Sequence, residues 1–161
     1  MPVIELKTKI RSSLELCFDL SASIELHQLS TVRTKEKAIA GTTKGIIKLN
    51  ETVTWEAVHF GIKQQLTSLI SQYNRPYHFR DEQVKGAFKN FRHDHYFETQ
   101  GDSVLVTDRF EYESPFGIFG KLFNRLVLTR YLTKFLRERN EMIRAFAESD
   151  KWKGLLREED Y

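Results

Sequence analysis

The segment that most constrains the fold lies near the C-terminus, from Phe119 to Glu148. It contains no proline, and its single glycine, Gly120, stands at its start. Apolar side chains recur along it at steps of three and four residues, which is the period of one helix face. They are Leu122, Phe123, Leu126, Val127, Tyr131, Leu132, Phe135, Leu136, Met142, Ile143 and Phe146. The pattern predicts one unbroken helix, roughly 45 Å long, with its apolar face against the rest of the chain.

The chain before this helix alternates between apolar and polar residues, as antiparallel strands do. The segments with this alternation or with strand-like composition are Val3–Arg11, Lys35–Ala40, Ile46–Leu49, Thr52–Phe60, Lys63–Tyr73, Tyr77–Glu82, Phe91–Gln100 and Ser103–Glu113. A turn at Gly41–Gly45 is expected to join two of them as a hairpin, and Gly86 is expected to mark a bulge or bend. Two short helices are predicted after the first strand, with a capping box at Ser12 and Glu15 and a second N-cap at Ser23. Because no strand–helix–strand repeat occurs, we expect an α+β fold with an antiparallel sheet of about seven strands.

Composition places the chain among ordinary globular proteins. Its 161 residues suit a single domain over residues 1–148, followed by a polar tail over residues 149–161. The formal charge is +3 with acidic residues interleaved among the basic ones, so no nucleic-acid partner is expected. No apolar run approaches the length of a membrane span, which argues against integral membrane association. The absence of a signal peptide and the single Cys17 predict a cytoplasmic protein.

Two neighbouring strands carry an unusual mixture on the faces that should point inward. Trp55 and His59 share one face of the first, and Gln64, Leu66 and Ser68 share one face of the second. A solid core rarely combines these residue types, because buried polar groups need partners. The mixture therefore predicts that both strands line a cavity.

The last two strands can be placed in register from their turn. Gly101-Asp102 is a suitable two-residue loop, with glycine at the first position as a type II′ turn requires. Pairing outward from the turn sets His95 opposite Asp108, Arg92 opposite Glu111 and Asp94 opposite Arg109. The two pairs of opposite charge are expected on a wet outer face. His95 and Asp108 are then neighbours on the inner face, where the carboxylate could orient the imidazole as a base or toward a ligand oxygen.

Several segments resemble one family. They are Phe18–Ser21, Glu51–Gly61, Phe79–Phe88, His93–Glu98, Thr107–Arg109 and Tyr112–Gly117, and the resemblance extends over residues 2–148. In these segments the chain resembles bacterial members of the START-like, polyketide-cyclase-like helix-grip superfamily, also called SRPBCC proteins. The resemblance implies a bent antiparallel sheet that grips a long C-terminal helix over a deep apolar cavity. It also implies binding of hydrophobic molecules such as lipids, sterols or polyketides.

Together these observations predict a protein that binds, and thereby transports or sequesters, a hydrophobic or aromatic small molecule without a cofactor. The predicted ligand-binding residues are Trp55, His59, Leu66, Phe91, His93, His95, Phe97, Asp108, Phe110, Tyr131 and Phe135. The alternative is a cyclase or dehydratase that uses His95 and Asp108 as acid and base, and an enzyme is the less favoured of the two. Metal binding by His93 and His95 with Asp108 is the less favoured interpretation of these residues, because no cysteine or further histidine cluster accompanies them.

Overall fold

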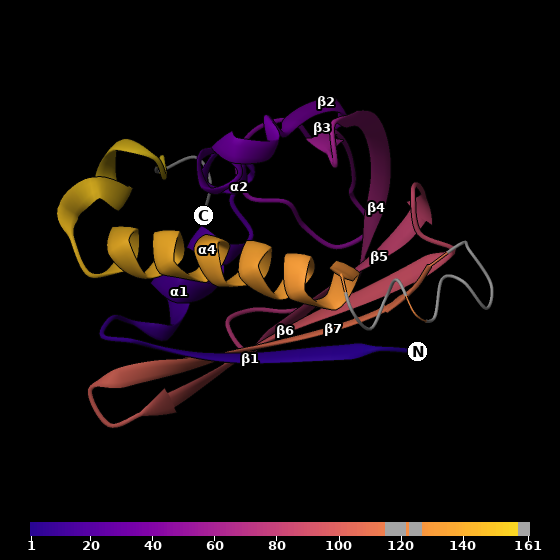
Figure 1. The fold of residues 1–161 in the computed structure, drawn as a ribbon. Coiled ribbons are helices and arrows are strands. Elements are labelled where there is room, and N and C mark those ends of the chain that lie inside the picture. The colour runs from indigo at the N-terminus through magenta and orange to yellow at the C-terminus, as the bar shows by residue number, and fades with distance from the viewer. Residues whose placement is uncertain (115–121, 123–126, 158–161) are drawn as a thin grey trace.

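The computed structural model describes residues 1–114, 122 and 127–157. Seven antiparallel strands form one sheet in the order β1-β7-β6-β5-β4-β3-β2, which confirms the predicted α+β fold. The strands are β1 (Val3–Ile10), β2 (Lys37–Gly41), β3 (Thr52–His59), β4 (Ile62–Asn74), β5 (His78–Lys85), β6 (Asn90–Gln100) and β7 (Ser103–Glu113). The helices are α1 (Leu14–Ser21), α2 (Ile24–Ser30), η1 (Val32–Thr34), α4 (Thr129–Ala147) and η3 (Asp150–Gly154). Helix α4 lies across the inner side of the bent sheet, with β1, β6 and β7 below it in the view of Figure 1 and β2 to β4 rising beyond it.

Helix α4 is the later part of the long helix that the sequence predicts. It runs without a break through Tyr131 and ends at Ala147. The expected start at Phe119 lies among the residues outside the described part of the chain. The buried face of α4 includes two polar residues, Arg139 and Asn140, beside Leu136 and Ile143. Helical periodicity of apolar residues does not predict these two, and both contact the sheet-side polar groups described below.

The two short helices after β1 have side-chain caps at their N-termini. Ser23 caps α2 as predicted, because its hydroxyl accepts a hydrogen bond from the amide of Leu26 at 3.2 Å. The cap of α1 is Ser13, which accepts from Leu16 at 3.2 Å, so the prediction of Ser12 as the capping residue was wrong by one position. Adjacent serines offer the same side chain, and the backbone at Ser13 is in the extended conformation that an N-cap adopts.

The predicted hairpin around Gly41–Gly45 does not form. Strand β2 pairs with β3 instead, and Ile46–Leu49 is not a strand but a loop with one isolated bridge between Ser23 and Ile46. Ile46 and Ile47 are both buried. Because consecutive residues of a strand point to opposite faces, two consecutive buried isoleucines fit a loop that crosses the core better than an edge strand.

The β6–β7 hairpin has the predicted register. His95 is opposite Asp108, Asp94 is opposite Arg109, and Arg92 is opposite Glu111. Gly101 has a positive φ of 62°, as a type II′ turn requires at its first position. The expectation of a wet surface for Asp94 was wrong: its side chain is buried and bonded to Arg80 and His78 of β5, which lies on the other side of β6.

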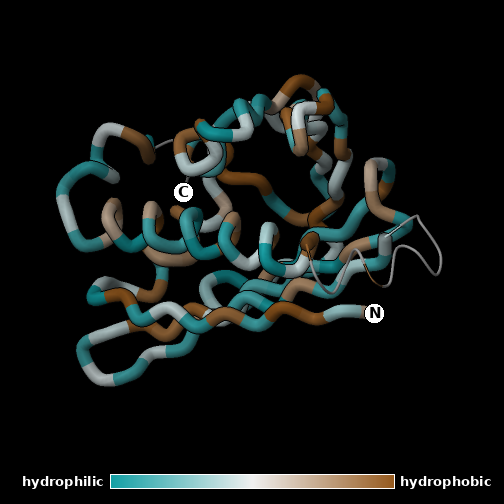
Figure 2. Tube along the Cα trace, viewed as in Figure 1, coloured by the Kyte–Doolittle hydropathy of each residue, from teal (hydrophilic) through white to brown (hydrophobic). Residues whose placement is uncertain are grey.

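Two apolar clusters hold the sheet and helices together. The larger joins α1, α2 and the C-terminal half of α4 to the sheet, and the smaller lies under the N-terminal half of α4. In Figure 2 hydrophobic stretches run along β1 and through the interior between α2 and the sheet. The segment predicted as a polar tail after residue 148 contributes too, since Leu156 is buried in the larger cluster and Trp152 packs against it.

Candidate ligand-binding site

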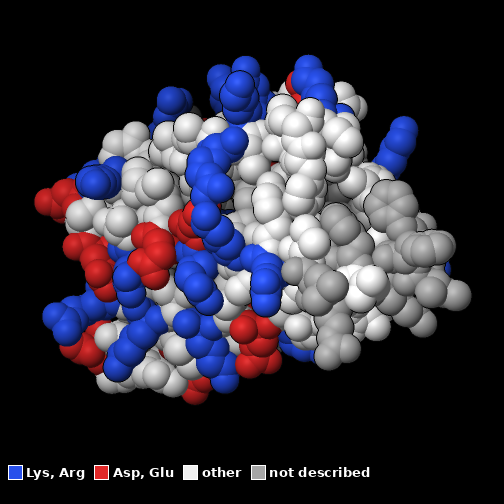
Figure 3. Space-filling model, in the orientation of Figure 1, with Lys and Arg blue, Asp and Glu red and all other residues white. Residues whose placement is uncertain are grey.

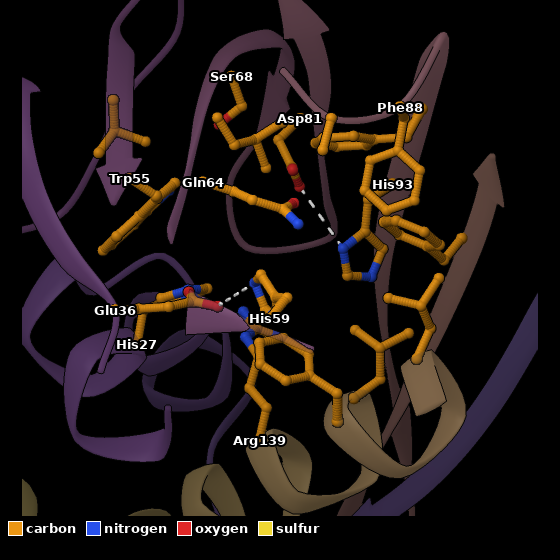
Figure 4. A pocket seen from close by; sticks show the side chains of 18 of the residues that line it. His27, Glu36, Trp55, His59, Gln64, Ser68, Asp81, Phe88, His93 and Arg139 are labelled. Atoms are coloured by element: carbon orange, nitrogen blue, oxygen red, sulfur yellow. Dashed lines mark hydrogen bonds and ion pairs between the residues drawn. The ribbon is translucent and has the colours of Figure 1, made fainter. Parts of the chain in front are cut away.

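A cavity of about 780 Å³ lies between the sheet and α4. It is lined mainly by apolar and aromatic side chains, among them Trp55 and Leu66 from the sheet and Leu132 and Phe135 from α4. The lining residues of β3 to β6 all stand on one face of their strands, as the pleat of a strand dictates, and β7 contributes Phe110. Figure 4 shows polar side chains around Glu36 and around Asp81, with Gln64 between them.

The first group, which we call the Glu36 cluster, consists of Glu36, His27, His59 and Tyr131. The Glu36 carboxylate lies 2.5 Å from His27 Nε2 and 3.6 Å from His59 Nε2. The other nitrogen of His59, Nδ1, is 2.7 Å from the Tyr131 hydroxyl on α4. Trp55 stacks on the His27 ring with centroids 4.1 Å apart. The cluster thus connects α2 and the loop before β2 with β3 and α4.

Protonation of His59 is disfavoured in this wall. Burial lowers the pKa of His59 below its ordinary value, and the negative charge of nearby Glu36 opposes this shift only in part. A neutral His59 between a carboxylate and a hydroxyl can donate one hydrogen bond and accept another.

The second group, which we call the Asp81 cluster, consists of Asp81, His93 and His95. Asp81 Oδ1 lies 2.9 Å from His95 Nε2 and 3.7 Å from His93 Nδ1. The two imidazole rings face each other with centroids 3.8 Å apart. All three residues border the cavity, and Figure 4 shows Asp81 and His93 pointing toward each other from β5 and β6.

Behind the two imidazoles lies Asp108, which is fully buried. Its Oδ1 is 2.9 Å from His93 Nε2 and 3.0 Å from His95 Nδ1, while its Oδ2 accepts a hydrogen bond of 2.6 Å from Asn140 Nδ2 on α4. Only the contact with His93 has the angles of a hydrogen bond, so at His95 the short distance is an electrostatic contact. The Arg139 guanidinium is 3.7 Å from the same carboxylate.

The charges in this group follow from these contacts. Burial opposes ionisation of Asp108, but the imidazoles of His93 and His95 outweigh it and hold the pKa of Asp108 well below its usual value. Burial would likewise lower the pKa of His95, yet the carboxylates of Asp108 and Asp81 raise it. The pKa of His93 is lowered by burial and by the neighbouring charge of His95. The pKa values of the two imidazoles are therefore shifted in opposite directions, upward at His95 and downward at His93.

Most of the side chains predicted to bind a ligand border the cavity. Those that do are Trp55, His59, Leu66, Phe91, His93, His95, Phe110, Tyr131 and Phe135. Asp108 and Phe97 do not. Asp108 is covered by the two imidazoles, and Phe97 packs against Phe18 of α1 with ring centroids 5.3 Å apart. Phe97 has the inward direction that its strand position predicts, but it lies beneath α1 and beyond the end of the cavity.

Sequence reasoning missed the ionisable residues His27, Glu36, Asp81 and Arg139 of the wall, and also the serines Ser21, Ser23 and Ser114. Asp81 could have been found, because strand alternation places it on the same face as Phe79. Glu36 and His27 lie at the end of a loop and on a short helix, where no periodicity indicates direction. Arg139 stands on the buried face of α4, where the helical period of the apolar residues does not indicate a charged side chain.

The strand order, the two short helices after β1 and the C-terminal helix over the sheet define a START-like helix-grip fold, so the resemblance is confirmed at the level of the fold. No family model matches the sequence, and comparison with curated proteins finds no relative. Solved structures do match over most of the chain.

Within the described residues, no helix is long and apolar enough to cross a membrane.

Three of these structures illustrate the match. The protein TTHA0849 of Thermus thermophilus superposes with a TM-score of 0.71 at 18% identity, covering 91% of this chain and 99% of that one. The ginseng major latex-like protein 151 of Panax ginseng has a TM-score of 0.66 at 20% identity, covering 92% and 98%. A START superfamily protein of Mycobacterium smegmatis has a TM-score of 0.64 at 13% identity, covering 88% and 98%. At these identities the similarity establishes the fold.

Proposed function

We propose that this protein binds a hydrophobic or aromatic small molecule in the cavity between the sheet and α4, and so carries or sequesters it. The observation that supports the proposal is the cavity itself, about 780 Å³ within a mostly apolar wall. Ligand pockets of roughly 300–1,000 Å³ with apolar linings and a few polar groups are typical of sites for drug-sized molecules. Water finds few hydrogen-bond partners in a cavity whose wall is mostly apolar. An apolar ligand, by contrast, makes dispersion contacts with that wall and is removed from unfavourable hydration.

The polar side chains constrain what the ligand looks like. The Glu36 cluster and the Asp81 cluster lie on different elements, and Figure 4 shows the side chain of Gln64 between them. A ligand with an apolar or aromatic body and hydrogen-bonding groups can satisfy both the wall and one or both clusters. A carboxylate can accept more hydrogen bonds than Glu36 and Asp81 receive from the imidazoles. A pure hydrocarbon would exclude water from these oxygens and offer no donor in return, which costs free energy. We therefore expect a ligand of mixed character, such as a hydroxylated aromatic or alicyclic compound.

Binding can be tested with anilinonaphthalene sulfonate, a dye with an aromatic body and one polar group. We expect saturable fluorescence enhancement with one dye per folded protein. Gln64 and Gln65 are neighbours on β4, but only Gln64 borders the cavity, while Gln65 is exposed. Gln64→Trp should fill part of the cavity and weaken dye binding at least tenfold. Gln65→Trp introduces the same side chain on the outer face and should leave binding unchanged.

Two results would contradict the proposal. Equal dye affinity in both tryptophan variants would place the dye outside the cavity, and absence of saturable binding to the folded wild type would remove the evidence for an accessible site. Native mass spectrometry of protein purified from its own host then identifies the ligand through the additional mass.

Acid–base catalysis is the second candidate, because His93 and His95 border the cavity with a carboxylate behind them. The same contacts favour binding instead. Nε2 of His95 is held by Asp81 and Nδ1 lies against Asp108, so neither nitrogen is left to take a proton from a bound molecule. His93 likewise has Asp108 at one nitrogen and Asp81 near the other.

A further inference from the structure

The Asp81 cluster brings together two imidazoles and one carboxylate, a donor set that the sequence does not place in one site. His93 and His95 stand two apart on β6, so both point to the cavity face. Asp81 comes from β5, where it is paired directly with His93. One donor atom from each of the three lies within 4.8 Å of the other two. Among the residues that the structure describes, no other group of histidine, cysteine and acidic side chains converges in this way.

The distances within the cluster fit one small cation. Zinc and similar ions bind imidazole nitrogen and carboxylate oxygen at roughly 2.0–2.2 Å, so two donors on one ion are about 3–3.5 Å apart. Asp81 Oδ1 is 2.9 Å from His95 Nε2 and 3.7 Å from His93 Nδ1, which brackets that separation. One donor atom of each residue lies within 4.8 Å of the other two, so an ion bound by all three draws these donors together. The side chain of Asp81 is the most exposed of the three.

On each imidazole of the Asp81 cluster, the nitrogen that points away from Asp81 contacts a second carboxylate. Nε2 of His93 and Nδ1 of His95 both lie within 3.0 Å of Asp108 Oδ1. Metal-bound histidines usually direct their second nitrogen to a carboxylate or carbonyl, which fixes the ring and increases its basicity. Asn140 in turn holds the other oxygen of Asp108 at 2.6 Å. Asp108 is thus placed to orient both rings so that His93 Nδ1 and His95 Nε2 face Asp81.

We propose that Asp81, His93 and His95 form a binding site for a divalent first-row transition-metal ion in the wall of the cavity. Imidazole and carboxylate ligands suit Zn²⁺, Fe²⁺, Co²⁺ and Ni²⁺, and two histidines with one carboxylate leave coordination positions free. All three ligands border the cavity, so the free positions face the space in which a small molecule would lie. The two carboxylates, Asp81 and Asp108, supply negative charge to balance the ion. The site does not depend on the apolar ligand, because all of its donors belong to the protein.

Cobalt binding provides the test. The purified protein is stripped with a chelator, dialysed and titrated with Co²⁺ while visible absorption and heat of binding are recorded. We expect one Co²⁺ per chain, with ligand-field absorption that Zn²⁺ abolishes by displacement. Asp81→Asn, His93→Gln and His95→Gln should each weaken binding by at least about 100-fold, more than loss of a residue behind the ligands. Asp108→Asn should weaken binding by about 10- to 100-fold, because it only orients the rings.

The chain offers matched controls, since it has five histidines and only two belong to the cluster. His78→Gln removes a histidine on the outer face of β5, and His59→Gln removes one from the Glu36 cluster. Both should bind Co²⁺ as the wild type does. Circular dichroism and thermal melting of the metal-free variants show which of them are folded. Asp81→Asn is expected to fold, because Asp81 is the most exposed of the three ligands and asparagine has a side chain of the same shape.

The result that overturns the proposal is Co²⁺ affinity in folded Asp81→Asn equal to that of the wild type. Wild-type protein that binds no Co²⁺ at micromolar concentration overturns it equally, and so does a loss of binding in His78→Gln or His59→Gln as large as in His93→Gln. Dye binding measured on the same samples separates this outcome from failure of the ligand-binding proposal, because the cavity can bind dye whether or not the metal binds.

Discussion

Two buried carboxylates on the β6–β7 hairpin, Asp94 and Asp108, show that the partners of a buried charge depend on which neighbouring elements pack against it. They lie on opposite faces of the sheet, and each is almost completely buried. Asp94 is bonded to Arg80 and His78, whereas Asp108 is held by imidazoles and an amide. Register could predict that His95 is beside Asp108. It could not predict burial of Asp94, because Arg80 comes from a strand whose place beside β6 is unknown from the turn alone.

At the residue scale the surroundings of His59 predict a dependence on pH. Burial lowers the pKa of His59 in the folded protein, whereas in the unfolded chain it is about 6.5. Between these two values the unfolded chain binds more protons, so the contribution of His59 to the free energy of unfolding rises with pH in this window. It is fully present above pH of about 6.5 and is lost as the pH falls toward the lower, folded-state pKa.

Imidazole proton resonances recorded between pH 4 and 8 provide the measurement. The midpoint for His59 should lie below its ordinary value, and Glu36→Gln should lower it further because the carboxylate charge favours the protonated ring. His59→Gln assigns the resonance and should flatten the pH dependence of stability in this window. A midpoint above the ordinary value, or a Glu36→Gln variant that raises it, would contradict this account.

At the scale of elements, local sequence patterns predicted the structure best where they extended without interruption over a whole helix or hairpin. The β6–β7 register followed from a two-residue turn and two pairs of opposite charge, and α4 followed from its apolar period. The partner of β2 was not predictable in this way, since ten residues (42–51) separate it from β3 and contain two buried isoleucines in a loop. Pairing across so long a connection depends on how the whole sheet closes.

The turn that sets the β6–β7 register gives a prediction for this element. Gly101 has a φ of +62°, and a Cβ added there would meet no atom within 4 Å, so only the backbone would be strained. Gly101→Ala should lower the free energy of unfolding by about 1–2 kcal/mol. Gly154 in η3 has equally open surroundings without a positive φ, so Gly154→Ala should change it by less than about 1 kcal/mol.

Urea unfolding of both variants provides the measurement, with the slope against urea concentration compared to show that the extent of unfolding is unchanged. A Gly101→Ala variant as stable as the wild type would mean that the turn tolerates a side chain and does not hold the register through glycine.

At the scale of the whole molecule, charges of both signs are interleaved where the surface is charged. Figure 3 shows Lys and Arg side chains, with Asp and Glu among them, at the left and centre of the face that includes α4, and a largely uncharged area to their right. Several are paired there, as Arg33 and Lys134 are with Glu138. In the interior, by contrast, the charged groups have specific partners, and some of these groups lie in the cavity wall, as Asp81 does, and some away from it, as Asp19 and Asp94 do. Sequence alone could predict an inward mixture of polar and aromatic residues, but not that Glu36 and Asp81 collect the histidines into two separate clusters.

A cavity in the interior has a consequence for the stability of the whole fold. The wall atoms lose dispersion contacts that a filled core would have, so a residue that fills the space should stabilise the protein while it excludes the ligand. Ser68 lies on β4, is buried and borders the cavity. Ser68→Leu should raise the free energy of unfolding by about 1 kcal/mol and the melting temperature by about 2–4 °C, and should weaken dye binding at least tenfold. Thr99→Leu, at an exposed position of β6, serves as the control and should change neither quantity.

The free energy of unfolding of Ser68→Leu should rise while its affinity for the dye falls. A stabilised Ser68→Leu variant with wild-type dye affinity would mean that the dye and the leucine occupy different spaces. A destabilised variant would mean that the wall around Ser68 is already closely packed, since overpacking costs about 1–3 kcal/mol. Saturating dye should raise the melting temperature of the wild type and of Thr99→Leu equally, because a ligand that binds only the folded state stabilises it by mass action. In Ser68→Leu that increase should largely disappear, which ties the stability of the fold and the capacity of the cavity to the same volume.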